Sequence, residues 1–189
     1  MKVFDSGMPE EAYWKSLFNV PLIIDWLNLK NVSDPISEIG CGYGTFTIPV
    51  ARRTKVDVHA FDIEPDMIET ARKNAELAGV HNVHFHLQDI IDHGTGLESQ
   101  STGMVLLFNI LHFDDRRILL KEAFRILKPN GTVAIIHWRK DIETPRGPSV
   151  ESRPDKEMIL HSAKGLGFSF GGNSRILGPY HWGMQLVKE

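Results

Sequence analysis

The residues best suited to bind a ligand are a run of alternating glycines and two aspartates that follow it in the chain. The run reads Glu38-Ile39-Gly40-Cys41-Gly42-Tyr43-Gly44 and begins within a strand-like segment at residues 36–40. Glycine in a turn between a strand and a helix permits a tight bend and lets a ligand approach the backbone. The spacing alone suits several cofactors, so its meaning depends on the residues downstream.

Asp62 and Asp89 lie at the ends of the next two strand-like segments, residues 56–62 and 82–87. A carboxylate at Asp62 can accept hydrogen bonds from both ribose hydroxyls of an adenosine. A carboxylate at Asp89 can accept from the adenine amino group, while the following backbone N–H donates to the ring. Because the carboxyl ends of parallel strands share one edge of a sheet, we predict a site for a ligand with a ribose and an adenine but no phosphate.

Thr45 stands where the dinucleotide fingerprint places its third glycine. In that fingerprint the third glycine allows close helix packing beside a pyrophosphate. The threonine therefore counts against NAD. An NAD(P)-dependent oxidoreductase would also need a catalytic Tyr/Lys pair or a substrate domain, and neither is evident, but this class stays open as an alternative.

Gly and Pro divide the rest of the chain into alternating strand-like and helix-like segments. Further strands are expected at 104–109 and 132–137, and helices at about 45–53, 65–79 and 155–165. Asp114 is a plausible N-cap for another helix, which carries Ile118 and Leu127. Residues 128–131 (Lys-Pro-Asn-Gly) are expected to break the preceding helix, and the next strand is expected to start at 132. Strands separated by helices predict a parallel α/β sheet with helices on both faces. Gly178-Pro179 joins strand-like segments 168–177 and 180–187, so the last strand should run antiparallel to its neighbour.

The length and composition predict a single domain, residues 1–189, with an N-terminal helical cap or lid at 1–34 and a Rossmann-like core at 35–189. The net charge is −3 and no Lys/Arg run is present, which argues against nucleic acid as a partner. One cysteine excludes an internal disulfide, and no apolar run is long enough to span a bilayer. We expect a cytoplasmic protein with no membrane partner, either a monomer or a homodimer.

Five segments in this order resemble the class I S-adenosylmethionine-dependent methyltransferases. They are ISEIGCGYG at 36–44, FDI at 61–63, QDI at 88–90, LFNILH at 107–112 and FRILKPNG at 124–131. The resemblance covers about residues 36–138 and is nearest the ubiquinone/menaquinone-biosynthesis-like small-molecule branch. It implies a Rossmann-like, doubly wound, seven-stranded sheet that is mostly parallel and has an antiparallel last strand.

The resemblance also implies S-adenosylmethionine as the cofactor and a role for each matching residue. Asp62 would bind the ribose, and Ile63 would pack on the adenine. Asp89 and Ile90 would hold the adenine edge. Asn109 would lie beneath the methionine amino group and the transferred methyl. The residues that would line the methionine moiety are Glu38, Gly40, Gly42 and Gly44.

Three residues are candidates for the acceptor side of the reaction. His112 and His137 follow or end the fourth and fifth strands, where a neutral imidazole can take a proton from an acceptor hydroxyl or thiol. Histidines that only shape the pocket are the alternative. Arg146, between Pro145 and Gly147, can clamp an anionic acceptor, or it can belong to an ordinary surface loop.

No metal is expected at the site. His84 and His86 alternate on one strand near His81, but no further ligand signature accompanies them. Cys41 is interpreted as a packing residue between two glycines, since a reactive thiol needs a depressed pKa.

The sequence around Asn109 narrows the acceptor. Asn109-Ile110-Leu111-His112 differs from the Asn/Asp-Pro-Pro-Tyr/Phe pattern of enzymes that methylate exocyclic amines. We therefore expect metal-independent methyl transfer to a small molecule. A lid formed by the segment around Tyr13 and Trp14 and by the loop 139–153 would exclude water. A non-catalytic S-adenosylmethionine-binding subunit is the other alternative.

Overall fold

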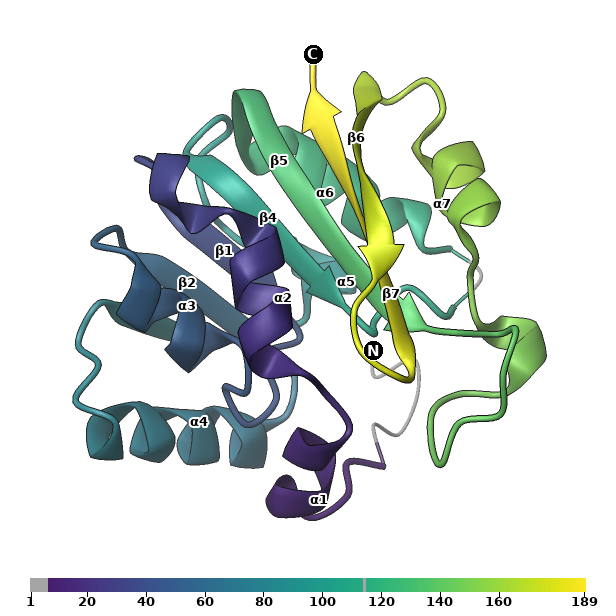
Figure 1. The fold of residues 1–189 in the computed structure, drawn as a ribbon. Coiled ribbons are helices and arrows are strands. Elements are labelled where there is room, and N and C mark those ends of the chain that lie inside the picture. Colours follow the sequence, from purple (N-terminus) through teal and green to yellow (C-terminus); the bar gives the residue numbers. More distant parts are fainter. Residues whose placement is uncertain (1–6, 114) are drawn as a thin grey trace.

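The computed structural model describes residues 7–113 and 115–189, in which helices cover both faces of a central sheet (Figure 1). Within these residues the sheet has seven strands in the order β3-β2-β1-β4-β5-β7-β6. β7 (His181–Lys188) is antiparallel to both of its neighbours, β5 and β6 (Phe168–Ile176). The predicted seven-stranded fold, mostly parallel with an antiparallel last strand, is confirmed. The parallel strands are β1 Ile36–Ile39, β2 Val58–Asp62, β3 Val83–Leu87, β4 Thr102–Phe108 and β5 Leu127–Trp138.

Two groups of helices pack on the two faces of the sheet, and strand β4 shows how. Leu106 and Phe108 join the apolar cluster of one face, whereas Val105 and Leu107 join the cluster of the other. All four side chains are buried, as expected for a central parallel strand covered on both sides. The first face carries α2 Val20–Leu27, α3 Thr47–Arg53 and α4 Pro65–Leu77, and the second carries α5 Ile90–His93, α6 Arg117–Ile126 and α7 Lys156–Ala163.

Strand β5 begins earlier than predicted. The helix α6, whose predicted N-cap Asp114 lies outside the described residues, ends at Ile126, just before the break predicted at residues 128–131. The predicted strand start at 132 is wrong, however, because Leu127 already pairs with Thr102 of β4. The register then shifts, so that Met104 pairs with Thr132. Asn130 has a left-handed φ of 64° inside this irregularity. The four residues therefore form a bulge within one long strand.

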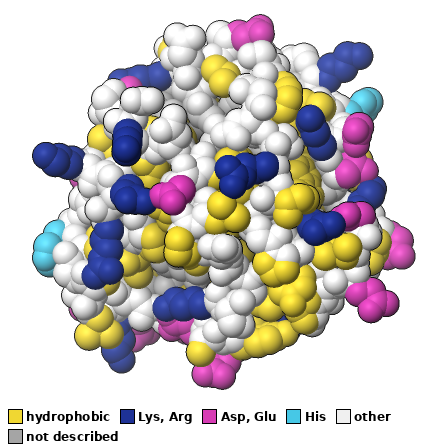
Figure 2. Space-filling view, in the orientation of Figure 1, with side chains coloured by type: hydrophobic (Ala, Val, Ile, Leu, Met, Phe, Trp, Pro, Cys, Tyr) yellow, Lys and Arg dark blue, Asp and Glu magenta, His cyan; other side chains and the backbone are white. Residues whose placement is uncertain are grey.

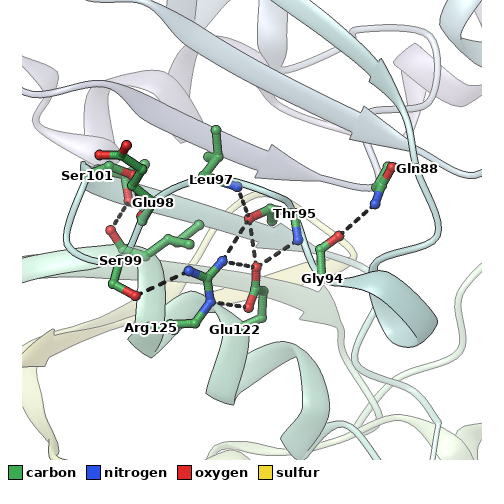
Figure 3. A network of polar contacts seen from close by, with 11 residues as sticks. Gln88, Gly94, Thr95, Leu97, Glu98, Ser99, Ser101, Glu122 and Arg125 are labelled. Carbon is green, nitrogen blue, oxygen red and sulfur yellow. Dashed lines mark hydrogen bonds and ion pairs between the residues drawn. The ribbon is translucent and has the colours of Figure 1, made fainter.

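The connection from β3 to β4, residues 88–101, is held to α6 by a polar network (Figure 3). Thr95 donates its backbone N–H and its hydroxyl to Glu122 Oε1, both at 2.7 Å. Arg125 holds the same carboxylate, with Nε 2.8 Å from Oε2 and Nη2 2.7 Å from Oε1. Burial alone would raise the pKa of Glu122, but the hydrogen bonds from Arg125 and Thr95 outweigh it and lower that pKa to about 2.

We expect Glu122→Gln to lower the free energy of unfolding by about 1–3 kcal/mol, because bonds to a charged acceptor are lost. Urea denaturation at neutral pH measures this loss. The folded pKa lies below the ordinary value of 4.5, so the contribution is present above pH 4.5 and is lost as the pH falls towards 2. The free energies of unfolding of the wild type and of Glu122→Gln should therefore become equal in acid. Glu69→Gln, exposed on α4, is the control, and an equal loss there would contradict the prediction.

Candidate functional site

A cavity of about 780 Å³ lies at the carboxyl ends of the parallel strands. Its wall includes the last residue of β2, Asp62, the last residue of β4, Phe108, and the last residue of β5, Trp138. The strand order reverses between β1 and β4, and ligands of doubly wound sheets bind above such a reversal. The volume is within the range of about 300–1,000 Å³ that is typical of small-molecule sites.

The glycine loop between β1 and α3 forms the floor of the cavity. Gly40 has a φ of 80°, and a Cβ there would lie 2.7 Å from Ile110 Cγ2, so no larger residue fits without displacement. The backbone N–H of Gly40 donates to the carbonyl of Phe61 at 2.8 Å, which ties the loop to β2. Gly42 has a φ of 51° and donates its N–H to Asp62 Oδ2 at 2.8 Å.

Asp62 connects the glycine loop to the residues that follow β2. Its Oδ1 accepts the backbone N–H of Glu64 at 3.0 Å, while Oδ2 accepts from Gly42. Burial raises the pKa of Asp62, and the two backbone hydrogen bonds act against that rise. A carboxylate has about four lone-pair sites, so two acceptor positions remain for ribose hydroxyls.

The predicted adenine contacts also lie in the cavity wall. Ile63 is 37% exposed even though it is a large apolar side chain, so it offers a flat apolar surface beside Asp62. Asp89 is the N-cap of α5 and accepts the N–H of Ile91 at 3.0 Å. Ile90 follows it in the wall. The three segments Gly40–Gly42, Asp62–Ile63 and Asp89–Ile90 thus meet as the sequence predicts.

Asn109 and Thr45 line the cavity, and each carries buried polar side-chain atoms that have no hydrogen-bond partner within the described residues. Both amide atoms of Asn109 and the hydroxyl of Thr45 are buried without a hydrogen bond there. Asn109 has a φ of 57°, and its N–H donates to the Ile136 carbonyl at 2.8 Å, so the backbone holds this strained position. Buried polar groups are normally bonded, so these atoms indicate a ligand. From the sequence, Thr45 is not predicted as a binding residue; it indicates only that the loop departs from the dinucleotide fingerprint.

Glu38 and Gly44 lie behind the cavity wall. Glu38 is buried, its Oε2 accepts from the Thr47 hydroxyl, and burial raises its pKa to about 8. Gly44 packs beneath α3, where a Cβ would lie 3.1 Å from Ile48 Cδ1. Their roles toward a methionine moiety stay predictions.

The two candidate histidines occupy different layers. His112 lines the cavity, and burial lowers its pKa, so the imidazole is neutral at physiological pH. His137 is completely buried outside the cavity wall, with its ring centroid 5.9 Å from that of His112. Burial also lowers the pKa of His137. His137 therefore stands behind His112 and has no surface on the cavity. His181 is buried as well and stacks on Phe18 at 4.3 Å.

Arg146 lines the cavity from the loop after β5, and a second arginine braces that loop. Arg153 is only 5% exposed and donates to three backbone carbonyls: those of Pro148 at 2.9 Å, Arg139 at 2.7 Å and Arg146 at 3.5 Å. Gly147 packs against the Trp138 ring, so closely that a Cβ would lie 2.9 Å from it. The sequence offered no signal for Arg153, because a lone arginine at the end of a polar loop has no diagnostic spacing.

The N-terminal segment lies across the glycine loop. Three of its residues belong to the cavity wall, namely Gly7, Met8 and Trp14. Trp14 lies within the short helix α1 (Glu11–Ser16). Tyr43 donates its hydroxyl to the Pro9 carbonyl at 2.7 Å. The expected lid therefore has a physical attachment to the glycine loop. Residues 1–6 of the lid lie outside the described residues.

The other candidate groups do not form a second site. His59 Nδ1 lies 3.1 Å from His86 Nε2, and throughout residues 7–113 and 115–189 no three His, Cys, Asp or Glu side chains are placed to hold a metal ion. Cys41 is buried, and burial raises the pKa of its thiol well above the ordinary value. No helix in the described part of the chain has the length and apolarity to cross a membrane.

Comparison with known proteins agrees with this geometry. A sequence profile of the family described as "Methyltransferase domain" matches residues 31–166. The Schizosaccharomyces pombe protein named uncharacterized methyltransferase-like C25B8.10 is 28% identical over 126 residues, which are 65% of this chain and 46% of that protein. The 23S rRNA (uracil(1939)-C(5))-methyltransferase RlmD of Histophilus somni is 40% identical over 67 residues, 35% of this chain and 15% of that protein. The chain thus spans less than half the length of these two relatives.

A solved structure shares the whole fold. The crystal structure of a SAM dependent methyltransferase from Aquifex aeolicus superposes with a TM-score of 0.81 at 20% identity, and the match covers 95% of this chain and 94% of that one. At this identity the likeness shows the fold alone. The family profile, in contrast, covers most of the chain and includes the glycine loop, Asp62, Asp89 and Asn109. The chain therefore belongs to the methyltransferase domain family.

Proposed function

We propose that this protein transfers a methyl group from S-adenosylmethionine to a small-molecule acceptor without a metal. The observation that carries the proposal is one cavity lined by Asp62, Asn109 and Thr45, in which the side chains of Asn109 and Thr45 have buried polar atoms with no partner among the described residues. Asp62, Ile63 and Asp89 suit an adenosine, and the Asn109 amide and the Thr45 hydroxyl suit the polar end of a methionine. Glu38, Gly40, Gly42, Gly44 and Ile90 complete the proposed cofactor site.

When bound, S-adenosylmethionine supplies an electrophilic methyl group on a sulfonium. The protein contributes mainly positioning and the exclusion of water. Trp14 and Met8 cover the cavity from the N-terminal side, and Trp138 closes it from β5. An acceptor hydroxyl or thiol loses its proton as it is methylated, and the neutral imidazole of His112 is placed to take that proton. In this proposal His137 positions His112 from behind.

The acceptor is proposed to be small because the sequence has no Lys/Arg run that approaches a nucleic-acid footprint. Lys and Arg are spread over the face shown in Figure 2 and are interleaved with acidic and apolar side chains. The net charge is −3. RlmD is named for a 23S rRNA substrate, but its similarity covers 35% of this chain. Membership of the ubiquinone/menaquinone-biosynthesis-like branch, a single domain at 1–189, a monomeric or homodimeric state and a cytoplasmic location belong to the same proposal.

Titration calorimetry with S-adenosylmethionine, S-adenosylhomocysteine and NADH tests the donor. We expect both sulfur compounds to bind and NADH not to bind. Tight NADH binding would instead favour an oxidoreductase. A screen for methyl transfer to small hydroxyl, thiol and carbon acceptors tests catalysis, and binding without transfer to any acceptor would favour a non-catalytic subunit.

The lid part of the proposal depends on the bond between Tyr43 and Pro9. Tyr43→Phe removes this hydrogen bond and should weaken S-adenosylhomocysteine binding about two- to tenfold. Amide hydrogen exchange in residues 8–14 should accelerate, because the segment loses its attachment to the glycine loop. Tyr180→Phe, just before β7 and outside the cavity wall, is the control. Unchanged exchange in residues 8–14 of Tyr43→Phe would rule out this attachment.

A further inference from the structure

The charged side chains around the cavity are divided between its two ends. Asp62, Glu64 and Asp89 lie where β2 and β3 end, which is the proposed adenosine side. Arg146 lies in the loop after β5 and is the one Lys or Arg of the described residues in the cavity wall. The strand order places β1 and β4 between the two groups. The cavity wall is therefore acidic where β2 and β3 end and carries a positive charge at the loop after β5.

Arg146 is held at the cavity with no counter-charge among the described residues. The residue is half-buried, and no carboxylate of the described residues lies within ion-pair distance of its guanidinium. Its backbone carbonyl accepts hydrogen bonds from the Thr144 hydroxyl at 2.6 Å and from Arg153 at 3.5 Å, and the following Gly147 packs on the Trp138 ring. A guanidinium that is pre-positioned and unpaired favours a carboxylate, which it can bind through two parallel hydrogen bonds.

Aromatic side chains form the wall at the same end. Trp14 and Trp138 both line the cavity, with ring centroids 6.3 Å apart. Phe46 and Phe108 line it too and pack edge to face at 5.0 Å. Rings in such walls interact favourably with other flat aromatic groups in stacked or edge-to-face arrangements. This half of the cavity therefore combines flat apolar surfaces with one positive charge.

We propose that the methyl acceptor is a planar aromatic compound that carries a carboxylate, with its ring against the apolar wall that contains Trp14 and its carboxylate on Arg146. This inference rests on the proposed methyltransferase function and names the substrate class of that site. A single guanidinium matches a single negative charge, which favours a carboxylate over a more highly charged phosphate. The competing partner for Arg146 is the carboxylate of the methyl donor itself, because Arg146 also acts electrostatically on Tyr43 of the glycine loop.

Calorimetric titration with three probes separates these contributions. Protein saturated with S-adenosylhomocysteine is titrated with 2-naphthoate, with its neutral isostere 2-naphthamide, and with acetate, which has the charge but no ring. We expect 2-naphthoate to bind at least about tenfold more tightly than either of the others. Arg146→Gln should reduce 2-naphthoate affinity to that of 2-naphthamide and leave S-adenosylhomocysteine affinity within about twofold.

Arg139→Gln is the matched control, since Arg139 belongs to the same loop but pairs with Asp141 outside the cavity wall. It should retain the preference for 2-naphthoate. Equal binding of 2-naphthoate and 2-naphthamide would overturn the charge requirement, and equal binding of acetate would overturn the aromatic one. A tenfold loss of S-adenosylhomocysteine affinity in Arg146→Gln would assign the guanidinium to the donor. Failure of the wild type to bind S-adenosylhomocysteine would refute the proposed function instead, whatever the naphthoate result.

Discussion

Replacing Asp62 by asparagine should weaken S-adenosylhomocysteine binding by about 100-fold or more, since at least two bonds to a charged acceptor are lost. The carboxylate holds the Gly42 N–H at 2.8 Å and the Glu64 N–H at 3.0 Å, and it is proposed to accept the ribose hydroxyls as well. An asparagine has nearly the same size, but one of its two terminal groups donates rather than accepts. It therefore loses bonds to the ligand and loosens the glycine loop at the same time.

The pH dependence of binding provides a second test of Asp62. Burial raises the pKa of this carboxyl above its ordinary value of 3.8. Wild-type affinity should therefore decline on acidification earlier than an exposed aspartate would allow, because the protonated form accepts fewer hydrogen bonds. Asp66→Asn, exposed in the first turn of α4, makes the same charge change away from the cavity. If both variants bound equally well, Asp62 would not be the ribose ligand.

The second large effect is expected at His112. His112→Gln should lower kcat by about 10²–10⁴-fold, the usual contribution of general acid–base catalysis, while S-adenosylhomocysteine affinity stays the same. A glutamine keeps polarity on the cavity wall but cannot take a proton. The measurement is single-turnover methyl transfer to an acceptor identified by the screen above.

The pH profile distinguishes a base from a residue that only shapes the pocket. Burial lowers the pKa of His112 below its ordinary value of 6.5, so the neutral, active form should persist into mild acid. Wild-type kcat should be flat at neutral pH and fall below the lowered pKa. This acidic limb should disappear in His112→Gln. His81→Gln, on the exposed turn before β3, is the control, and a kcat loss below about threefold at His112 would favour the pocket-shaping alternative.

Most residues of the proposed methyl-donor site could be predicted from the sequence, because their positions depend on local backbone geometry. Alternating glycines are required wherever successive loop residues need positive φ, and Gly40, Gly42 and Gly44 all have it. The ends of parallel strands share one edge, so Asp62 and Asp89 had to lie on the same side of the sheet. The bulge at residues 128–131, in contrast, was not predicted. Its Pro-Asn-Gly sequence is typical of a break, and only pairing with Thr102 keeps the chain in the strand.

Which side chains reach the proposed acceptor part of the cavity depends on contacts between distant parts of the chain. His112 and His137 are equivalent as sequence features, since each comes at or just past a strand end, yet only His112 reaches the cavity. Arg146 reaches it because Arg153 and Trp138 hold its loop in place. Sequence patterns within single segments therefore sufficed to predict the sheet, the glycine loop and the positions of Asp62 and Asp89, because their geometry follows from the backbone. Long-range packing selected the side chains that face the acceptor, because burial and loop position depend on every element packed around them.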